Sequence, residues 1–223
     1  MKLAVFDAYG TLLDVDAAAR QLAASGRFPD LAKNWPALAA LWRSRQLQYS
    51  WLRALTGHYV SFWQITEDGL DFALESLSLS DPALRDALLG LYRRLTPYDD
   101  ALPALERARA AGYQTAILSN ADSAMLADAA TSAGLDAHLD VLLSVDQAGI
   151  FKPDPSVYQL VCDHFDCRAD EVRFFSSNGW DIAGAGRFGF QTHWVNRAGQ
   201  PIERLGLTPD QIIPSLGEAI FAA

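Results

Sequence analysis

The sequence predicts an α/β fold with a mostly parallel sheet and helices on both faces, interrupted after its first strand by a helical insertion. Three observations lead to this prediction. The short, apolar run Leu3–Phe6 is typical of a buried strand. From Val15 to about Arg94 there is almost no strand signal, and from Asp99 onward strands and helices alternate. Such alternation is typical of βαβ units, which require a parallel sheet.

The insertion is predicted to be helical because leucine, alanine and tryptophan recur in it at helical spacing. The residues that show this spacing are Leu38–Trp42, Leu47, Trp51, Leu52 and Leu55. Since a helical block of this size needs a small core of its own, we expect residues 15–95 to form a cap domain. Residues 1–14 and 96–223 are expected to form a Rossmann-like catalytic core.

Proline and glycine mark the boundaries of the elements that follow the insertion. Pro97 ends the helical block, and Gly112 and Gly134 each end a helix. The helices are expected at Asp99–Ala111, Ser123–Ala133, Pro155–Phe165 and Ile182–Phe188. The strands are expected at Gln114–Leu118, Val141–Ser144, Val172–Phe175 and, as the last strand, Thr192–Val195.

The composition limits the classes of function. Acidic residues outnumber basic ones by 27 to 18, which gives a formal net charge of −9 and argues against binding to nucleic acid or to an anionic membrane. Cys162 and Cys167 lack metal-binding spacing, so we expect free thiols in a reducing compartment. With no signal-peptide pattern and no apolar run of ~20 residues, a cytoplasmic location is expected.

Polar side chains follow the predicted strands at the points where those strands end. Asp7 follows the first strand, Ser119 and Asn120 the second, Lys152 the third, and the segment Ser176–Asp181 the fourth. Ligands of open parallel sheets bind outside the carboxyl ends of the strands. Together these residues offer a nucleophile, an anion-binding pair, a cation and a second carboxylate, as a covalent hydrolase requires.

Each of these residues also has a purely structural interpretation. Asp7 could start a turn, and Ser119 and Asn120 could cap the next helix. Asp181 could interact favourably with the dipole of a helix near its N-terminus. Lys152 alone would be an ordinary solvated lysine. The joint placement at one edge of one sheet is harder to explain by capping and favours the functional interpretation.

In this order the motifs resemble those of the haloacid dehalogenase superfamily, and over essentially its whole length the chain is similar to the L-2-haloacid dehalogenases. The matching motifs are Asp7-x-Tyr9-Gly10-Thr11-Leu12, Leu118-Ser119-Asn120, Lys152-Pro153 and Ser176-Ser177-Asn178-Gly179-x-Asp181. The segments Trp42–Arg53 and Arg94–Tyr98 also look like those of the dehalogenases.

Two departures distinguish the chain from the phosphatases of that superfamily. Phosphatases carry a second Asp two residues after the nucleophile, and this chain has Tyr9 there. They also have further acidic residues in the fourth motif, which hold magnesium, whereas this chain has Asp181 alone in that motif. Magnesium normally needs one or two carboxylates plus substrate phosphate. The motifs therefore offer few ligands for a metal ion, and no metal or other cofactor is expected.

The resemblance implies hydrolysis of short-chain L-2-haloacids to D-2-hydroxy acids and halide, through an ester on Asp7. It implies as catalytic residues Asp7, Thr11, Lys152, Ser176, Asn178 and Asp181. It implies as substrate-binding residues Tyr9, Arg43, Leu47, Phe62, Ser119, Asn120, Tyr158 and Trp180.

The implied roles follow the charges that develop in this reaction. Lys152 would keep Asp7 ionised and aimed, and Asp181, with Ser176 and Asn178, would orient or deprotonate water. The substrate carboxylate would be bound by Ser119, Thr11 and the backbone near Tyr9, and the halide by Arg43, Asn120 and Trp180. Tyr9, Leu47 and Phe62 would line the pocket. Without the resemblance, Arg43 and Trp180 would be ordinary residues of a helix surface.

Two other functions stay open at this stage, a superfamily phosphatase acting on a small phosphate ester and a catalytically idle protein that binds a partner or a small anion. Tyr9 argues against the phosphatase, and the set of Asp7, Lys152 and Asp181 argues against an idle protein. The partners expected are a haloacid and a halide, together with a second copy of the chain, since the resemblance implies a homodimer.

Overall fold

The described part of the chain forms a six-stranded parallel sheet with the order β3-β2-β1-β4-β5-β6. The computed structural model describes residues 2–221. The strands are β1 (Leu3–Phe6), β2 (Gln114–Ser119), β3 (Val141–Ser144), β4 (Val172–Ser176), β5 (Gln191–Val195) and β6 (Gln211–Ile213). The side chains of β1 are fully buried, because β1 lies in the middle of the sheet between β2 and β4.

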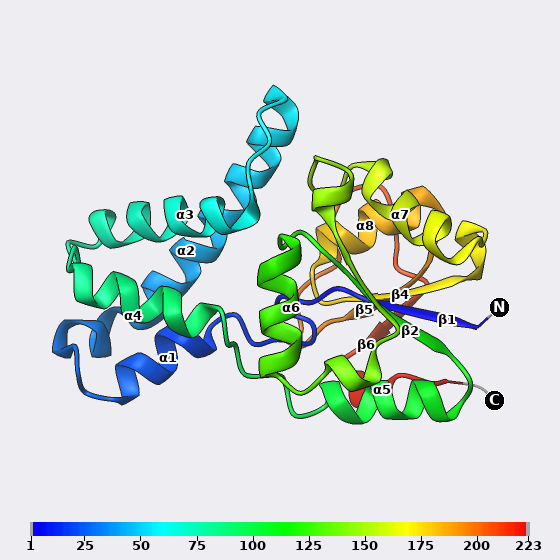
Figure 1. The fold of residues 1–223 in the computed structure, drawn as a ribbon, viewed down its shortest axis with the longest axis horizontal. Coiled ribbons are helices and arrows are strands. Elements are labelled where there is room, and N and C mark those ends of the chain that lie inside the picture. Colours follow the sequence, from blue (N-terminus) through cyan, green and yellow to red (C-terminus); the bar gives the residue numbers. More distant parts are fainter. Residues whose placement is uncertain (1, 222–223) are drawn as a thin grey trace. The chain divides into compact units, whose positions relative to one another are not determined.

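Four long helices flank this sheet. They are α5 (Ala101–Ala110), α6 (Ser123–Ser132), α7 (Pro155–Phe165) and α8 (Gly179–Phe188). In Figure 1, α5 lies on one side of the sheet and α7 and α8 lie on the other. Buried strands with helices on both faces are what continuous apolar runs such as Leu3–Phe6 require. The predicted α/β fold with a parallel sheet is therefore confirmed.

The chain divides into two compact units, one comprising Met1–Leu13 with Pro97–Ala223 and the other comprising Asp14–Thr96. The first unit holds the sheet. The helices described in the second unit are α1 (Ala17–Ala24), α2 (Pro29–Thr56), α3 (Phe62–Ser76) and α4 (Pro82–Tyr92). This unit has its own core, in which the ring of Trp42 packs 4.7 Å from that of Tyr92 and its Nε1 donates to the carbonyl of Thr66 at 2.8 Å.

Two predicted elements differ from the structure. The prediction that Thr192–Val195 is the last strand is wrong, since β6 follows β5 and pairs with it in parallel. The sequence signal of β6 is weak because the strand has three residues and two of them, Gln211 and Ile212, are exposed at the sheet edge. Helix α8 begins at Gly179 rather than at Ile182, so Asp181 lies in its first turn.

Residues 2–221 contain no helix that is both long and apolar enough to span a membrane.

The register of the sheet brings the strand ends together. Phe6 at the end of β1 pairs with Ile117 on one side and with Phe175 on the other. The next amide of the chain, that of Asp7, donates to the carbonyl of Phe175 at 2.9 Å. Asp7 is therefore fixed where β1 leaves the sheet, beside the ends of β2 and β4.

His193 on β5 is a buried titratable group of this sheet. Its ring stacks on Phe175, with the ring centroids 4.5 Å apart, and only 5% of the residue is exposed. Burial, with a smaller contribution from the charge of Arg173, lowers the pKa of His193 to about 4. The folded protein therefore keeps this imidazole neutral over a pH range in which the unfolded chain protonates it.

We expect this difference to make the protein less stable in acid. Because the folded pKa lies below the unfolded value of about 6.5, the contribution of His193 is complete above about pH 6.5 and is lost as the pH falls toward 4. The loss should approach about 3 kcal/mol in the free energy of unfolding. Urea unfolding between pH 7 and 4.5 should show a shallower fall for His193→Phe than for wild type. His164→Phe, at an exposed position of α7, is the matched control, and equal pH dependence in all three proteins would contradict this account.

Candidate active site

Asp7 is buried at the carboxyl edge of the sheet and its two oxygens have different partners. Oδ1 accepts a hydrogen bond from Lys152 Nζ at 3.2 Å. Oδ2 accepts from Thr11 Oγ1 at 3.0 Å and from Asn178 Nδ2 at 2.8 Å, and Ser176 Oγ lies 3.5 Å from it. Asp7 is only 6% exposed. A buried carboxylate with this many donors is held in one orientation.

Lys152 bridges Asp7 to a second carboxylate. Its Nζ lies 2.8 Å from Asp181 Oδ2, and the ammonium sits over the ring of Phe174, 5.1 Å from the centroid. Lys152 and Asp181 have no measurable exposure. Burial opposes ionisation of Lys152, but attraction to Asp181 and then to Asp7 outweighs burial and raises the pKa of Lys152. The ammonium therefore stays charged inside the protein.

Tyr158 on α7 completes the surroundings of Asp181. Its hydroxyl donates to Asp181 Oδ1 at 2.8 Å. Burial, followed by the charge of Asp181, raises the pKa of Tyr158 well above its ordinary value, so the phenol keeps its proton. Burial likewise raises the pKa of Asp181, and the Lys152 charge offsets part of that rise. Tyr158, Asp181, Lys152 and Asp7 thus form a continuous buried chain of hydrogen bonds.

The loop after β1 is fastened to the loop after β4. Ser177 donates its amide to Thr11 Oγ1 at 2.8 Å and its hydroxyl to the carbonyl of Gly10 at 2.6 Å. Gly10 has φ +93°, a conformation that favours glycine. Sequence reasoning gave no role to Ser177 or Gly10. Both residues lie within the matching motifs. They act on the main chain, Ser177 through hydrogen bonds to the loop after β1 and Gly10 through its backbone conformation.

Ser119 and Asn120 use their side chains to shape loops. Ser119 Oγ accepts from the amide of Ala121 at 3.1 Å. Asn120 Oδ1 accepts from the amide of Lys152 at 2.9 Å and so holds the loop that carries the lysine. Neither residue caps α6, whose N-cap is Asp122. Binding of a substrate carboxylate or a halide by this pair stays a prediction.

A family model supplies the identification. Residues 1–189 match the model of the haloacid dehalogenase-like hydrolases. The chain belongs to this family. Among curated relatives, it is 48% identical over 204 residues to (S)-2-haloacid dehalogenase 1 of Pseudomonas sp. (strain CBS-3), covering 91% of this chain and 88% of the relative. It is 46% identical over 204 residues to (S)-2-haloacid dehalogenase 4A of Burkholderia cepacia, covering 91% of this chain and 86% of the relative.

A solved structure agrees with these relatives. The L-2-haloacid dehalogenase of Xanthobacter autotrophicus, solved with chloropropionic acid covalently bound, superposes with a TM-score of 0.88 at 35% identity. The alignment covers 98% of this chain and 96% of that chain. The resemblance to the L-2-haloacid dehalogenases is thereby confirmed, and this member of the haloacid dehalogenase-like hydrolases is an enzyme of the class that acts on carbon–halide bonds.

The remaining predicted site residues are described within their own units. In the second unit, Arg43 and Leu47 lie one turn apart on α2, and Phe62 begins α3. In the first unit, Tyr9 is buried, and its carbonyl accepts from Asn178 Nδ2 at 3.3 Å. Trp180 on α8 lines a cavity of about 360 Å³ together with Pro153, Pro155, Ala183, Gly184, Arg187, Phe188 and Leu205.

The donor set at Asp7 does not suit the magnesium ion of the superfamily phosphatases. Within residues 2–221, no group of three or more histidine, cysteine, aspartate or glutamate side chains could hold a metal ion. The carboxylates of Asp7 and Asp181 already share the ammonium of Lys152. A divalent cation between them would have to displace a buried like charge.

Removing the ammonium should leave two poorly compensated carboxylates. We expect Lys152→Met to lower the free energy of unfolding by about 3–5 kcal/mol near neutral pH. The loss should shrink as the pH falls, because Asp181, whose pKa burial raises, can then take up a proton. Urea unfolding of Lys152→Met and of Lys152→Met/Asp181→Asn measures this, and the double variant should recover part of the loss. A single variant as stable as wild type at every pH would refute the account.

Proposed function

We propose that this protein hydrolyses short-chain L-2-haloacids to D-2-hydroxy acids and halide through an aspartyl ester on Asp7, without a metal ion. The observation that carries the proposal is the Asp7 carboxylate, which a lysine and two hydrogen-bond donors hold at the sheet edge. Tyr9 stands where a phosphatase would need a general acid. Chloropropionic acid is covalently bound in the Xanthobacter relative, which supports the ester.

In the first step, an oxygen of Asp7 attacks the carbon that bears the halogen. A C–O bond forms, the carbon–halogen bond breaks, and the halide leaves with the bonding electron pair while the carbon centre inverts. Oδ2 accepts from two close donors and Oδ1 from one. Oδ1 therefore has more lone-pair capacity left for attack, and Lys152 keeps it directed.

In the second step, water attacks the carboxyl carbon of the Asp7 ester and returns the enzyme. The oxyanion that develops would lie on Oδ2, where Thr11 and Asn178 already point hydrogen-bond donors. Asp181 accepts a proton of the water, the bond between the Asp7 carboxyl carbon and Oδ1 breaks, and Oδ1 leaves with the substrate carbon as an alkoxide. The alkoxide takes the proton back from Asp181 to give the D-2-hydroxy acid, and the Asp7 carboxyl group releases the second water proton to solvent. A carboxylate whose pKa is raised by burial is a stronger base than an exposed one, which suits it to this role.

The substrate-binding roles implied by the resemblance complete the proposal. Ser119, Thr11 and the backbone near Tyr9 bind the substrate carboxylate, while Asn120, Arg43 and Trp180 bind the halide. Tyr9, Leu47 and Phe62 line the pocket, and Tyr158 supports Asp181. Residues 15–95 act as the cap domain, and residues 1–14 with 96–223 act as the catalytic core.

Asp7→Asn should abolish turnover while the protein stays folded, because Lys152 keeps its pairing with Asp181. We expect chloride release from L-2-chloropropionate to fall by at least about a thousandfold. Chloride should be measured for wild type and variant with excess chelator present, with the D-isomer as control substrate. Single-turnover reaction in heavy-oxygen water should label Asp7 of the wild type.

Two outcomes would contradict the proposal. Turnover close to wild type in Asp7→Asn would remove Asp7 as the nucleophile. Phosphate release from a chromogenic phosphate ester that requires magnesium, with no chloride from either isomer, would instead identify a phosphatase.

We further propose that the protein is cytoplasmic. Free thiols at Cys162 and Cys167 support this location, since a reducing compartment maintains them.

We also propose that two copies of the protein associate through the face that α2 and α3 present. On α2 and α3, Leu55 is 83% exposed, and Leu52 and Phe72 are also exposed. Such apolar side chains at the surface are typical of an interaction site.

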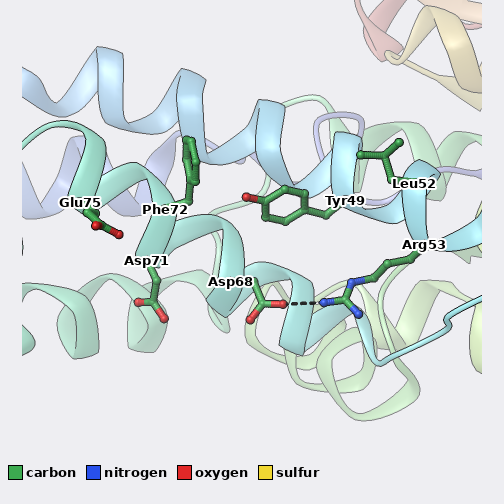
Figure 2. A pocket seen from close by; sticks show the side chains of 7 residues that line it. All are labelled: Tyr49, Leu52, Arg53, Asp68, Asp71, Phe72 and Glu75. Atoms are coloured by element: carbon green, nitrogen blue, oxygen red, sulfur yellow. Dashed lines mark hydrogen bonds and ion pairs between the residues drawn. The ribbon is translucent and has the colours of Figure 1, made fainter. Parts of the chain in front are cut away.

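The groove on this face suits a second copy because apolar and aromatic side chains line it. Its volume is about 470 Å³, and it is lined by Tyr49, Leu52, Arg53, Asp68, Asp71, Phe72 and Glu75 (Figure 2). Arg53 pairs with Asp68 at 3.0 Å across the groove. A two-fold interface brings the same patch of both copies together, so Leu52 and Phe72 of one copy would pack against the apolar side chains of the other.

We expect Leu52→Glu to shift the protein from dimer to monomer, because a carboxylate would be buried without a partner at the centre of the contact. Sedimentation equilibrium should show the dimer dissociation constant rising by at least about tenfold. Leu205→Glu is the matched control, as Leu52 and Leu205 are both 50% exposed and Leu205 lies in the other unit. A monomeric wild type would exclude the proposed dimer.

A further inference from the structure

Gly184 lies on α8, one turn after Asp181, where the helix meets Tyr158 and Pro153. A methyl carbon placed on Gly184 would lie 2.5 Å from the Tyr158 hydroxyl oxygen and 2.6 Å from Pro153 Cβ. Carbon contacts this short are not tolerated in packed proteins. Helix α8 can therefore lie this close to its neighbours only because residue 184 has no side chain.

Neither neighbour can easily give way. Tyr158 is fully buried, and the rings of Phe174, Phe188 and Phe190 surround its own, with centroids 6.1, 5.9 and 5.9 Å away. Pro153 is a rigid ring that directly follows Lys152 in the chain. A side chain at position 184 would consequently push Tyr158, the Lys152 loop or α8 itself out of place.

The contacts that such a shift would disturb are those of the proposed base. Asp181 accepts from Tyr158 at Oδ1 and from Lys152 at Oδ2, both at 2.8 Å. Lys152 in turn lies 3.2 Å from Asp7. Hydrogen bonds weaken rapidly beyond such distances, so a displacement of about 1 Å would break at least one of the hydrogen bonds that join Tyr158, Asp181, Lys152 and Asp7.

We propose that Gly184 is a positioning residue for the hydrolysis, because its missing side chain sets the separation of α8 from Tyr158 and Pro153 and so holds Asp181 against the Tyr158 hydroxyl and Lys152. Gly184 does not touch the reacting groups and acts through Tyr158 and Lys152. The expected effect of Gly184 on kcat rests on the proposed function. Its expected effect on the pKa of Asp181 follows from the geometry and can be measured without turnover.

Gly186 on the same helix provides a matched control. A methyl carbon there would lie 2.7 Å from Leu207 Cδ2 and 3.3 Å from Thr192 Cγ2, and the three atoms nearest to it all belong to these two residues. Leu207 is partly exposed, so its side chain has room to adopt another rotamer. Glycine to alanine raises intrinsic helix propensity by about 1 kcal/mol at either position. The two variants therefore differ in which neighbours they displace.

We expect Gly184→Ala to lower kcat for halide release from L-2-chloropropionate by about 10- to 100-fold, with a smaller change in KM. Gly186→Ala should stay within about twofold of wild type. If Gly184 acts through the Tyr158 hydroxyl, the effects of Gly184→Ala and Tyr158→Phe should be strongly non-additive in the double variant. Wild-type kcat in Gly184→Ala, or an equal loss in Gly186→Ala, would overturn the assignment.

The second readout is the titration of Asp181 in ¹³C-carboxyl spectra, assigned by comparison with Asp181→Asn. The groups that face Asp181 are Lys152, Asp7 and Tyr158, and the Tyr158 hydrogen bond lowers the pKa of Asp181. Gly184→Ala and Tyr158→Phe should both raise this pKa, and Gly186→Ala should leave it unchanged. An unchanged titration in Gly184→Ala would refute the positioning role.

The titration also separates the two proposals. If wild type released no halide, the proposed function would fail, while the pKa of Asp181 would still decide the role of Gly184.

Discussion

The ammonium of Lys152 is the group on which the site depends. It is fully buried between the carboxylates of Asp7 and Asp181 and forms an ion pair with each of them. Burying an unpaired charge costs several kcal/mol, whereas a pair with good geometry and further hydrogen bonds recovers much of that cost. Thr11, Asn178 and Tyr158 supply those further bonds. The charges, the donors and the loops that carry them therefore have to be assembled together.

The sheet topology makes this assembly feasible. With β1 between β2 and β4, the chain segments that follow these three strands leave the sheet at one edge. Asn120 after β2 then reaches the amide of Lys152, and Ser177 after β4 reaches Gly10 and Thr11 after β1. These side chains act mainly on loop backbones. They fix the loops from which the charged groups project, so the rigidity of the site comes from polar contacts with the main chain.

The sequence predicts the parallel sheet because apolar strands are strong local signals, and it predicts from the strand ends that Asp7, Lys152 and Asp181 lie at one edge of that sheet. Apolar strands that are followed by Asp7, Ser119 and Ser176 bring these residues to the same edge of a parallel sheet, whichever helices intervene. The exposed, three-residue β6 has no such signal, since edge strands bury too little apolar surface to impose a pattern. Contributions that run through the backbone, such as those of Gly10 and Ser177, are also invisible to patterns of side-chain chemistry. The loop-shaping contacts of Ser119 and Asn120 depend on neighbours that only the folded chain supplies.

The charge balance of the three buried groups bears on the direction of the proposed chemistry. With Asp7 and Asp181 ionised and Lys152 protonated, two negative charges and one positive charge leave an excess of one negative charge. Esterification of Asp7 removes that excess and leaves Lys152 paired with Asp181 alone. In a site of low polarity, a neutral ion pair is better stabilised than a group with net charge. Halide departure thus carries the surplus charge away from the buried groups, and hydrolysis of the ester restores it.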